Sequence, residues 1–400
     1  MGYLGNRYLI SAALESEFGE FNGASGDFCE LCPLEEGFSW SFGGPQMLDK
    51  PLMRADAANS PAHAGVRRPE VKFTLQARGA GVPAGHGAAA QLCRDLDAPL
   101  AACLGAARVA VGSGIVSASS ASNVTLSSAA SLRAGEIVWV DPDGDGVTYP
   151  RAVAAINGAA VELWPELPKT PASGGVVYAA CNFTPFCGPV QASMCLEKSS
   201  AVWAGKRLVE RVCGMAGSVA LARTGAREQL LLKFSLEGVD DECVETTGGA
   251  LPGSSAASHP WSPSPAPVRA SGAHLYMGSA ELHRHSSFEY EPGAEIKLRD
   301  DVTSASGAAS HFVSSWAEKG VLHMPWSASI RNLYESGTTF RMLWACGDAA
   351  NGVGLYIPSA QIMEIGRETM QGEEYMKLSF RAVRDALAPA RCLAFSGRRN

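Results

Sequence analysis

Two short runs of potential metal ligands occur in this 400-residue chain. The first, Asp141-x-Asp143-x-Asp145-Gly146, matches the first half of an EF-hand loop, in which alternate carboxylates face a calcium ion. Calcium binding also needs a bidentate glutamate at loop position 12, where this chain has Ala152. We expect strands rather than helices on both sides of the run. The residues therefore predict a tight Asp-Gly hairpin, and Asp141, Asp143 and Asp145 are a weak candidate cation site.

The second run, His283-Arg-His285, would place two imidazoles on one face of a strand. A zinc site needs further ligands, and no third one is indicated nearby, so we expect a solvated pair. Cys29 and Cys32 form a lone Cys-x-x-Cys without a second pair of ligands at a usual spacing. The eleven cysteines are scattered, and we expect them to be reduced and mostly buried in a protein folded in cytosol.

The sequence carries no assembled acid, base or nucleophile. The glycine run from Gly79 to Gly85 resembles a dinucleotide-binding fingerprint with its last glycine displaced, but Pro83 lies inside it and no parallel βαβ unit surrounds it. The chain has no Gly-x-Ser-x-Gly elbow, phosphate-binding loop or His-Glu-x-x-His motif. We therefore expect neither enzymatic activity nor a cofactor.

Composition favours a β-rich protein that covers much of its surface with other copies of itself. Charged residues make up 18% of the chain, below the ~25% of ordinary soluble domains. The 43 glycines and 23 prolines indicate many turns. The net charge is -7 and there is no basic tract, which argues against tight binding to nucleic acid phosphates. The N-terminus lacks the pattern of a signal peptide, and no apolar run approaches the ~18 residues of a membrane span.

Strand and turn patterns divide the chain into four parts. Residues 106–180 contain short, evenly spaced strands with turns such as Asn157-Gly158, which predicts a small inserted β module. We expect residues 1–105 and 181–245 to form a first domain around this module. Residues 246–270 are a Pro/Ser-rich linker, and residues 271–400 form a second domain. The best helix pattern is Ala88–Leu104, with a break expected at Pro99.

A short internal similarity predicts a duplicated fold. Lys233-Phe-Ser-Leu-Glu237 recurs in kind as Lys377-Leu-Ser-Phe-Arg381, 144 positions later by subtraction. Each copy follows a strand-like segment and a turn that contains glycine. Because both copies end a strand-rich half of the chain, we expect two similar domains in tandem.

The long stretch at residues 34–70 leaves two interpretations open. Phe38, Trp40 and Phe42 alternate with serine and glycine, which gives an extended segment one apolar face. The segment is either a strand that packs on its own domain or a hairpin arm that docks on a neighbouring subunit. Residues 245–270 are a second candidate contact segment, with Trp261 as its aromatic residue.

Segments that cover about half of the chain resemble the major tail tube proteins of long-tailed, siphovirus-like bacteriophages. The similarity to the core of that fold lies in Cys181–Pro185, Lys198–Trp203 and Leu230–Asp241. Further similar segments are the opening Gly2–Leu9, the helix pattern Ala88–Leu104, and Leu355–Pro358, Gln361–Ile365 and Lys377–Ala382 in the second half. The module at 106–180 is an addition to the minimal family pattern.

The resemblance implies a mainly β fold with two tandem tail-tube-like β-sandwich or barrel domains, each flanked by a helix or loop. It implies a structural virion protein that forms rings, which stack into a hollow tube for DNA ejection. If each chain has two such domains, three chains fill a pseudo-hexameric ring, so a trimer is favoured and a hexamer is the alternative. Expected partners are other copies of the chain, the tape measure protein and DNA in the lumen, and tail terminator and distal tail proteins at the ends. Phe38, Trp40, Phe42 and Trp261 are then candidate contacts between rings.

Two other classes of protein remain open at this point. A distal tail or baseplate ring protein would share the fold without stacking into tubes. A carbohydrate-binding, adhesin-like β-protein is indicated by the small β module and by Trp139, Trp164 and Trp203, although such tryptophans are more often core residues. The expected location is the virion tail, assembled in the host cytoplasm without a membrane.

Overall fold

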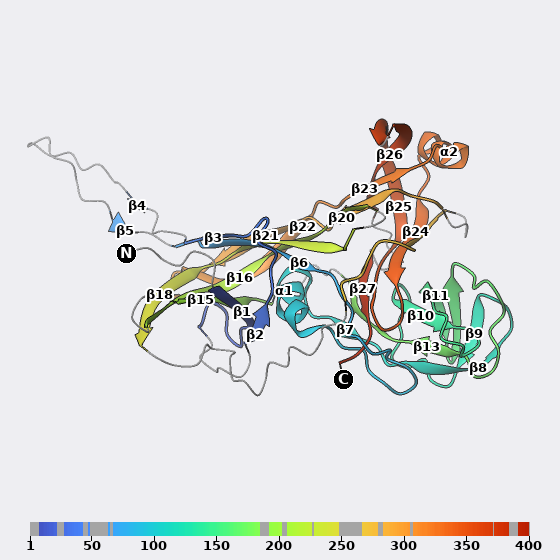
Figure 1. The fold of residues 1–400 in the computed structure, drawn as a ribbon, viewed down its shortest axis with the longest axis horizontal. Coiled ribbons are helices and arrows are strands. Elements are labelled where there is room, and N and C mark those ends of the chain that lie inside the picture. Colours follow the sequence, from blue (N-terminus) through green and yellow to red (C-terminus); the bar gives the residue numbers. More distant parts are fainter. Residues whose placement is uncertain are drawn as a thin grey trace, which may run out of the picture.

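The computed structural model describes residues 8–21, 28–42, 47–48, 63–64, 67–184, 192–201, 206–225, 228–247, 266–278, 283–304, 307–370, 372–383 and 391–399. Within these residues the chain forms 27 strands and two helices, which confirms the predicted mainly β fold. None of the described helices is long and apolar enough to cross a membrane. Figure 1 shows an elongated β body that rises at its upper right, with a small barrel below that end.

The first part of the body, here called the first unit, has a sheet whose strands alternate apolar and polar side chains. In β6 (Glu70–Gln76) and β17 (Leu231–Glu237) the apolar residues point into the core. Phe73 and Phe234 stack across these strands with ring centroids 5.0 Å apart. The other elements of the first unit are β1 (Tyr8–Leu14), β2 (Cys29–Leu31), β3 (Ser39–Ser41), β4 (Met47–Leu48), β5 (His63–Ala64), α1 (Arg94–Leu104), β15 (Met194–Ala201), β16 (Lys206–Gly225) and β18 (Asp240–Thr247).

The second unit follows in the C-terminal part of the chain. Its longest strand, β25 (Gly352–Met370), pairs with β26 (Glu373–Ala382). Phe288 and Trp344 stack in its core with ring centroids 4.5 Å apart. The other elements are β19 (His274–Met277), β20 (Ser287–Glu291), β21 (Ala294–Asp300), β22 (Ala308–Trp316), β23 (Lys319–Met324), α2 (Ala328–Ser336), β24 (Phe340–Gly347) and β27 (Cys392–Ser396).

The two units share one pattern of strand pairing. Strands β16, β17 and β18 of the first unit correspond in order and pairing to β25, β26 and β27 of the second. Seven pairings are shared. In the first unit they are β1–β15, β3–β6, β4–β5, β6–β17, β15–β16, β16–β17 and β16–β18. In the same order, the second unit has β19–β24, β20–β23, β21–β22, β23–β26, β24–β25, β25–β26 and β25–β27. The duplication predicted from Lys233–Glu237 and Lys377–Arg381 is therefore present in the strand pairing.

The predicted inserted module is a closed six-stranded barrel. It leaves the first unit after α1 through β7 (Arg108–Val109) and returns through β14 (Ala180–Phe183). The matching place in the second unit, between α2 and β24, holds only Gly337–Thr339. The barrel strands are β8 (Ser113–Ala118), β9 (Asn123–Leu126), β10 (Ile137–Asp141), β11 (Tyr149–Asn157), β12 (Ala160–Trp164) and β13 (Val176–Tyr178).

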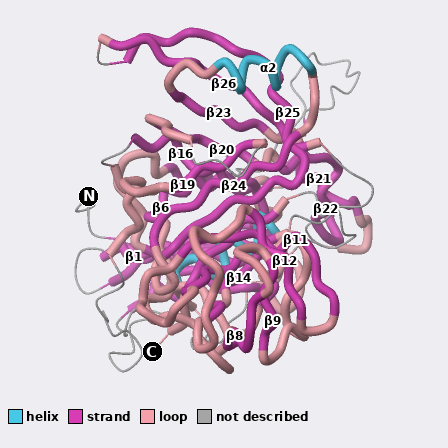
Figure 2. The backbone as a smooth tube through the Cα atoms, turned by 90° about the vertical axis from the view of Figure 1, so that its right-hand side faces the viewer, coloured by secondary structure: helices cyan, strands magenta, loops and turns pink. Residues whose placement is uncertain are grey.

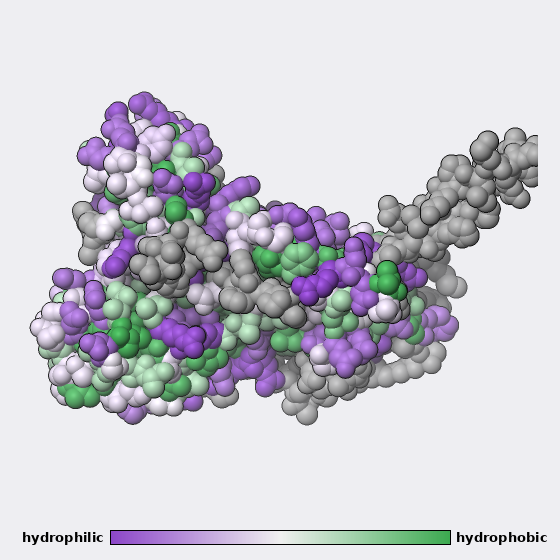
Figure 3. Space-filling model, turned by 180° about the vertical axis from the view of Figure 1, so that it is seen from behind, coloured by the Kyte–Doolittle hydropathy of each residue, from purple (hydrophilic) through white to green (hydrophobic). Residues whose placement is uncertain are grey.

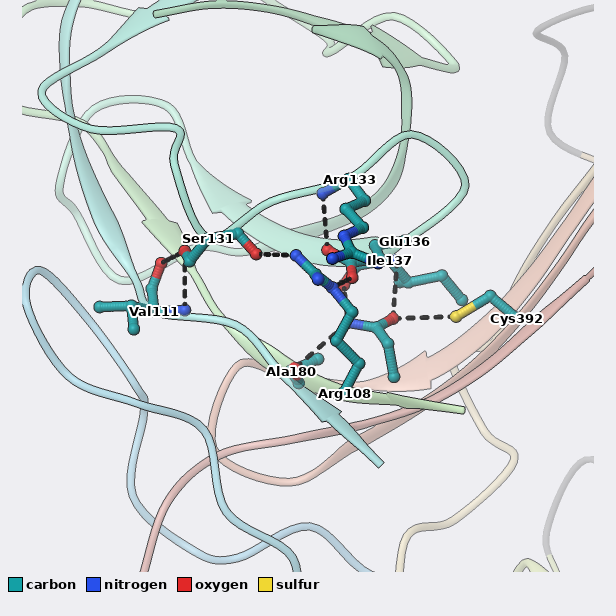
Figure 4. A network of polar contacts seen from close by, with 9 residues as sticks. Arg108, Val111, Ser131, Arg133, Glu136, Ile137, Ala180 and Cys392 are labelled. Atoms are coloured by element: carbon teal, nitrogen blue, oxygen red, sulfur yellow. Dashed lines mark hydrogen bonds and ion pairs between the residues drawn. The ribbon is translucent and has the colours of Figure 1, made fainter. Parts of the chain in front are cut away.

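The barrel is inserted in the first unit but packs on the second. The Asn182 side-chain oxygen accepts hydrogen bonds from the Ile137 N–H of the barrel and from the Cys392 thiol of β27, each at 2.9 Å (Figure 4). Strand β14 also pairs with β27. A Cβ at Gly352 would lie 2.7 Å from the Trp139 ring, so no side chain fits there. The insertion thus fixes the two units to each other within one chain.

The predicted helix Ala88–Leu104 begins later than expected, at Arg94. The preceding residues are extended because they pair with the chain around Ala110, and the Ala90 N–H donates to the Ala110 carbonyl at 3.0 Å. The helix also continues through Pro99, where a break was predicted. Proline removes one helical hydrogen bond, but Pro99 is buried in the tertiary packing of this short helix, which outweighs that loss.

Candidate self-assembly interface

The two units join edge to edge through antiparallel pairing of β16 with β20, here called the junction. Leu221 lies opposite Tyr290, Thr224 opposite Phe288, and Gly225 opposite Ser287. The pairing creates one sheet across the chain, in the order β3-β6-β17-β16-β20-β23-β26-β25. Figure 2 shows β16, β20 and β23 next to one another near the middle of this sheet. Within this sheet, the edge strand of the first unit, β16, thus pairs with the edge strand of the second unit, β20.

The register of the two units can be matched residue by residue. Ser235 and Ser379 lie at the same place in the repeated segments, and their partners are Lys72 and Val321. Those residues pair in turn with Ser39 of β3 and Glu289 of β20. The equivalence makes Trp40 the counterpart of Tyr290 and Phe38 the counterpart of Phe288. Aromatic residues therefore occupy the same two positions in both units.

The same equivalence leaves two edges of the joined sheet without partners among the described residues. The C-terminal half of β25 pairs with β26 alone, and β3 pairs with β6 alone. Leu221 at the junction is 2% exposed, whereas the side chain of Arg367, its counterpart in β25, is 71% exposed. The end that holds β25, β26 and α2 is mostly hydrophilic on the face that Figure 3 shows at upper left. An unpaired strand edge of this kind is a site for pairing with another chain.

Three of the four predicted ring contacts lie in or beside β3. The Phe38 ring stacks on Tyr8 at 5.3 Å, and the Lys198 ammonium lies 5.8 Å from the Trp40 ring. Both aromatic rings are half-buried at the margin of their own core, whereas Phe42 is 36% exposed. Trp261 lies outside the described residues. Ser39–Ser41 is thus a strand that packs on its own domain, as one of the two interpretations predicted. Residues 43–46, 49–62 and 65–66 of the same stretch lie outside the described residues, and a contact with another copy remains a prediction.

One face of the joined sheet is polar and is exposed except near the junction, where Ser287 and His323 are buried. Lys72, Lys233 and Lys377 lie on it, as do Glu237 and Glu364, and all five are exposed. Phe73, Phe234 and Leu378 point to the opposite, buried face. The tail tube resemblance also leads us to expect a tube wall of small, polar or acidic side chains on the strands Val71–Arg78, Arg207–Cys213, Leu230–Glu237 and Lys377–Ala382. Three of these strands belong to the joined sheet, but Arg207–Cys213 pairs with β15 and β18 outside it. The exposed face of the sheet carries both signs of charge.

The Asp141 carboxylate closes the barrel turn instead of standing free for a cation. One oxygen accepts the backbone N–H groups of Asp143, Gly144 and Asp145 at 3.2, 2.7 and 3.2 Å, and the other accepts that of Gly146 at 2.8 Å. Asp143 also pairs with Lys169. The described residues contain no group of three or more acidic, histidine or cysteine side chains placed to hold a metal. The turn between β10 and β11 accounts for these aspartates.

The predicted strand position of His283 and His285 is wrong, because both residues lie in irregular chain before β20. His285 Nε2 lies 3.1 Å from the Trp344 indole nitrogen, which donates to it, and His283 Nε2 lies 3.4 Å from the Met277 carbonyl. Tertiary partners thus hold each imidazole separately.

All ten described cysteines are free thiols and six of them are buried. Cys29 is half-buried and Cys32 exposed, and burial raises the pKa of Cys29 to about 11. A raised pKa keeps a thiol protonated and weakens it as a metal ligand or nucleophile. The reduced, mostly buried state predicted from the sequence therefore holds for the described cysteines.

One polar arrangement was not predicted from the sequence. Ser287 Oγ lies 2.9 Å from His323 Nδ1, and His323 Nε2 lies 2.8 Å from a Glu368 carboxylate oxygen. Serine, histidine and a carboxylate in this order also form the catalytic triad of serine hydrolases. Ser287 is only 3% exposed and His323 1%, so a substrate cannot reach the hydroxyl. The arrangement serves as a polar link across β20, β23 and β25, and no motif connects residues so far apart in the sequence.

Protonation of His311 should weaken the contact between the hairpin β21–β22 and the first unit. His311 Nε2 lies 2.5 Å from the Gly214 carbonyl, and burial lowers the pKa of His311. A folded pKa below the unfolded value of ~6.5 means that this histidine's contribution to stability is full above that pH and is lost as the pH falls below it. Urea unfolding between pH 7.5 and 5.5 should show a steeper loss for the wild type than for His311→Gln, by up to about 1.4 kcal/mol per pH unit. Equal slopes would contradict this assignment.

The sequence matches no protein-family model, and a search of curated proteins also finds no match. The strand pairing and the free edges of the joined sheet are therefore the features of this chain that bear on its function.

Proposed function

We propose that this chain is a structural virion protein whose copies join edge to edge into rings that stack as the hollow tail tube of a long-tailed bacteriophage. The observation that carries the proposal is the junction between β16 and β20. It joins two equivalent units head to tail, and the equivalent strands β25 and β3 are left with free edges at the two ends of the sheet. The same contact can thus form again between copies.

Repetition of one head-to-tail contact gives a closed ring when the rotation between units returns to its start. Each chain supplies two equivalent units, so three chains supply the six positions that the tail tube resemblance implies. Closure pairs every edge of the joined sheet, which removes the aggregation hazard of free strands. The ring is then a continuous barrel with the polar face of the sheet on one side and the buried cores on the other.

The charge of the chain is compatible with DNA passage through such a barrel. A net charge of -7 and a sheet face with both signs of charge offer no continuous positive path for phosphates. Counterion release would otherwise hold DNA to the wall with an affinity that rises with every phosphate neutralised. The polar face of the sheet is our assignment for the lumen wall.

The adhesin alternative is disfavoured by two of the tryptophans that suggested it. Trp139 of the barrel is fully buried, and the Trp164 ring lies 5.8 Å from Tyr356 of the second unit. Neither ring forms an exposed platform for a sugar. Trp203 lies outside the described residues. A distal tail ring protein stays the second candidate, because it would use the same junction without axial stacking.

Negative-stain electron microscopy of the purified full chain at high concentration tests the proposal. We expect hollow, regularly striated tubes, and rotational averages of end views should have threefold symmetry with six similar lobes. Single rings that never stack in any salt would favour the distal tail protein. A chain that stays monomeric at every concentration would count against both candidates.

A further inference from the structure

The junction inside the chain is closed by buried side chains. Leu221 and Tyr290 lie opposite each other and are 2% and 1% exposed. The Tyr290 hydroxyl donates to Glu318 at 3.1 Å, and Glu318, which directly follows the β21–β22 hairpin, pairs with Arg391. The side chains of this ion pair are only 9% and 3% exposed. The contact between the two units of one chain is therefore built like a protein core.

At the free edge of the second unit, the equivalent position carries an exposed charge. Arg367 is the counterpart of Leu221, and its partner in β26 is the fully buried Met376, so Arg367 lies on the apolar face of the sheet. Its guanidinium lies 4.9 Å from the centroid of the Trp326 ring, and that tryptophan is 43% exposed. One guanidinium nitrogen is 3.8 Å from a Glu374 oxygen. An arginine thus lies on an aromatic ring at the margin of this edge.

The free edge of the first unit carries aromatic rings. Trp40 lies opposite the fully buried Val71, so it points to the same apolar face of the sheet as Arg367 does. The Lys198 ammonium lies 5.8 Å from the Trp40 ring, but it also pairs with Glu210 at 2.7 Å, which compensates its charge. Phe42, two residues after Trp40, is 36% exposed. This edge therefore offers aromatic surface without an uncompensated positive charge beside it.

The register of the junction, repeated between two copies, sets Trp40 opposite Arg367. Two residues further along, Phe42 lies opposite Ile365, which is half-buried. The two edges lie toward opposite ends of the body (Figure 1), so the contact forms between chains. Directly opposed residues in a sheet have Cβ atoms ~4.5–5.5 Å apart on one face. An arginine is attracted to the face of a tryptophan ring within ~6 Å of its centroid.

We propose that Arg367, which lies on Trp326 of its own chain, packs against Trp40 of the neighbouring copy and determines which strand edges join. This inference rests on the proposed function and deepens it. In the free chain the exposed charge hinders pairing of the β25 edge with unsuitable strands, as charged side chains do on natural sheet edges. A second copy of this chain supplies the aromatic ring that accepts the charge. Trp40 then serves a contact within a ring, not between rings as the sequence led us to expect.

Arg367→Gln in the full chain tests the contact, because this exposed side chain contributes little to the core. We expect the variant to need an about tenfold higher protein concentration to assemble, as measured by sedimentation. That factor corresponds to about 1.4 kcal/mol per contact. Arg367→Lys keeps the charge without the planar group that stacks on rings, so it should also assemble less well than the wild type. Arg331→Gln is the matched control, because Arg331 is 66% exposed and lies outside the proposed contact.

A double-mutant cycle with Trp40→Leu identifies the partner ring. If Arg367 and Trp40 touch, the double variant should assemble about as poorly as the worse single variant, since one contact is lost only once. Trp40→Tyr keeps an aromatic ring and should assemble nearly as well as the wild type. Urea unfolding of the unassembled variants separates weaker assembly from weaker folding.

Two results would overturn the inference and leave the proposed function standing. One is an Arg367→Gln chain that assembles at the wild-type concentration or below it, because the arginine would then only guard the edge. The other is a double variant whose loss equals the product of the two single losses, because the two residues would then act independently. A wild type that never assembles would instead defeat the proposed function, and this inference with it.

Discussion

Oxidation of a Ser41→Cys/Gly366→Cys variant should link neighbouring copies into covalent rings of three chains. At the junction Leu221 faces Tyr290, and their counterparts at the free edges are Arg367 and Trp40. The next antiparallel pair is then Gly366 and Ser41. Directly opposed Cβ atoms lie ~4.5–5.5 Å apart in a sheet, close to the ~3.5–4.5 Å that a disulfide needs. A non-reducing denaturing gel should show a ladder of products that ends at three chains.

Both positions can accept cysteine. Ser41 is exposed, and a Cβ at Gly366 would meet nothing closer than Lys377 at 3.9 Å. The exposed Cys32 and Cys243 should first be replaced by serine. Ser39→Cys/Gly366→Cys is the control for register, because diagonal neighbours lie ~7–8 Å apart and should link poorly. Equal linkage by both pairs, or a ladder that continues beyond three chains, would contradict the predicted closure.

The features that the sequence predicted correctly are those with a local signal. The mainly β fold could be predicted because segments such as Glu70–Gln76 and Leu231–Glu237 alternate apolar and polar residues with the period of a strand that has one buried face. The barrel was predicted because turn residues such as Asn157 and Gly158 separate its short strands. The similarity of Lys233–Glu237 to Lys377–Arg381 was enough to find the duplication, since both segments occupy the same place in equivalent sheets.

The features that the sequence did not predict depend on partners distant in the chain. The sequence pattern indicates two separate strands at Lys206–Cys213 and Ser218–Ala222, but β16 runs unbroken from Lys206 to Gly225 because its halves pair with different neighbours. Its N-terminal half pairs with β15 and β18, and its C-terminal half with β17 and β20. No local pattern tells which edges meet, so the free edges of β3 and β25 could be identified only once the pairing was known. The polar link from Ser287 to Glu368 could not be predicted for the same reason, because its residues are far apart in the sequence.

Replacement of Arg391 by methionine should destabilise the folded chain by about 3–5 kcal/mol, because it leaves the Glu318 carboxylate buried without its cation. The two side chains are 3% and 9% exposed, so water cannot replace the lost charge. Urea unfolding of the unassembled chain at neutral pH measures the effect. Arg331→Met is the matched control, because the Arg331–Glu335 pair is largely exposed and should contribute less than about 1 kcal/mol.

The double variant Arg391→Met/Glu318→Gln separates an unpaired buried charge from lost packing. If the charge dominates, neutral glutamine should recover a large part of the stability that Arg391→Met loses, since it still accepts from the Tyr290 hydroxyl. If the double variant is as unstable as the single one, the loss comes from the contact of the arginine with Trp316 instead. Because Tyr290 lies opposite Leu221 in the junction, Arg391→Met should also speed amide exchange in β20. Unchanged exchange in β20 would mean that the ion pair supports the hairpin alone.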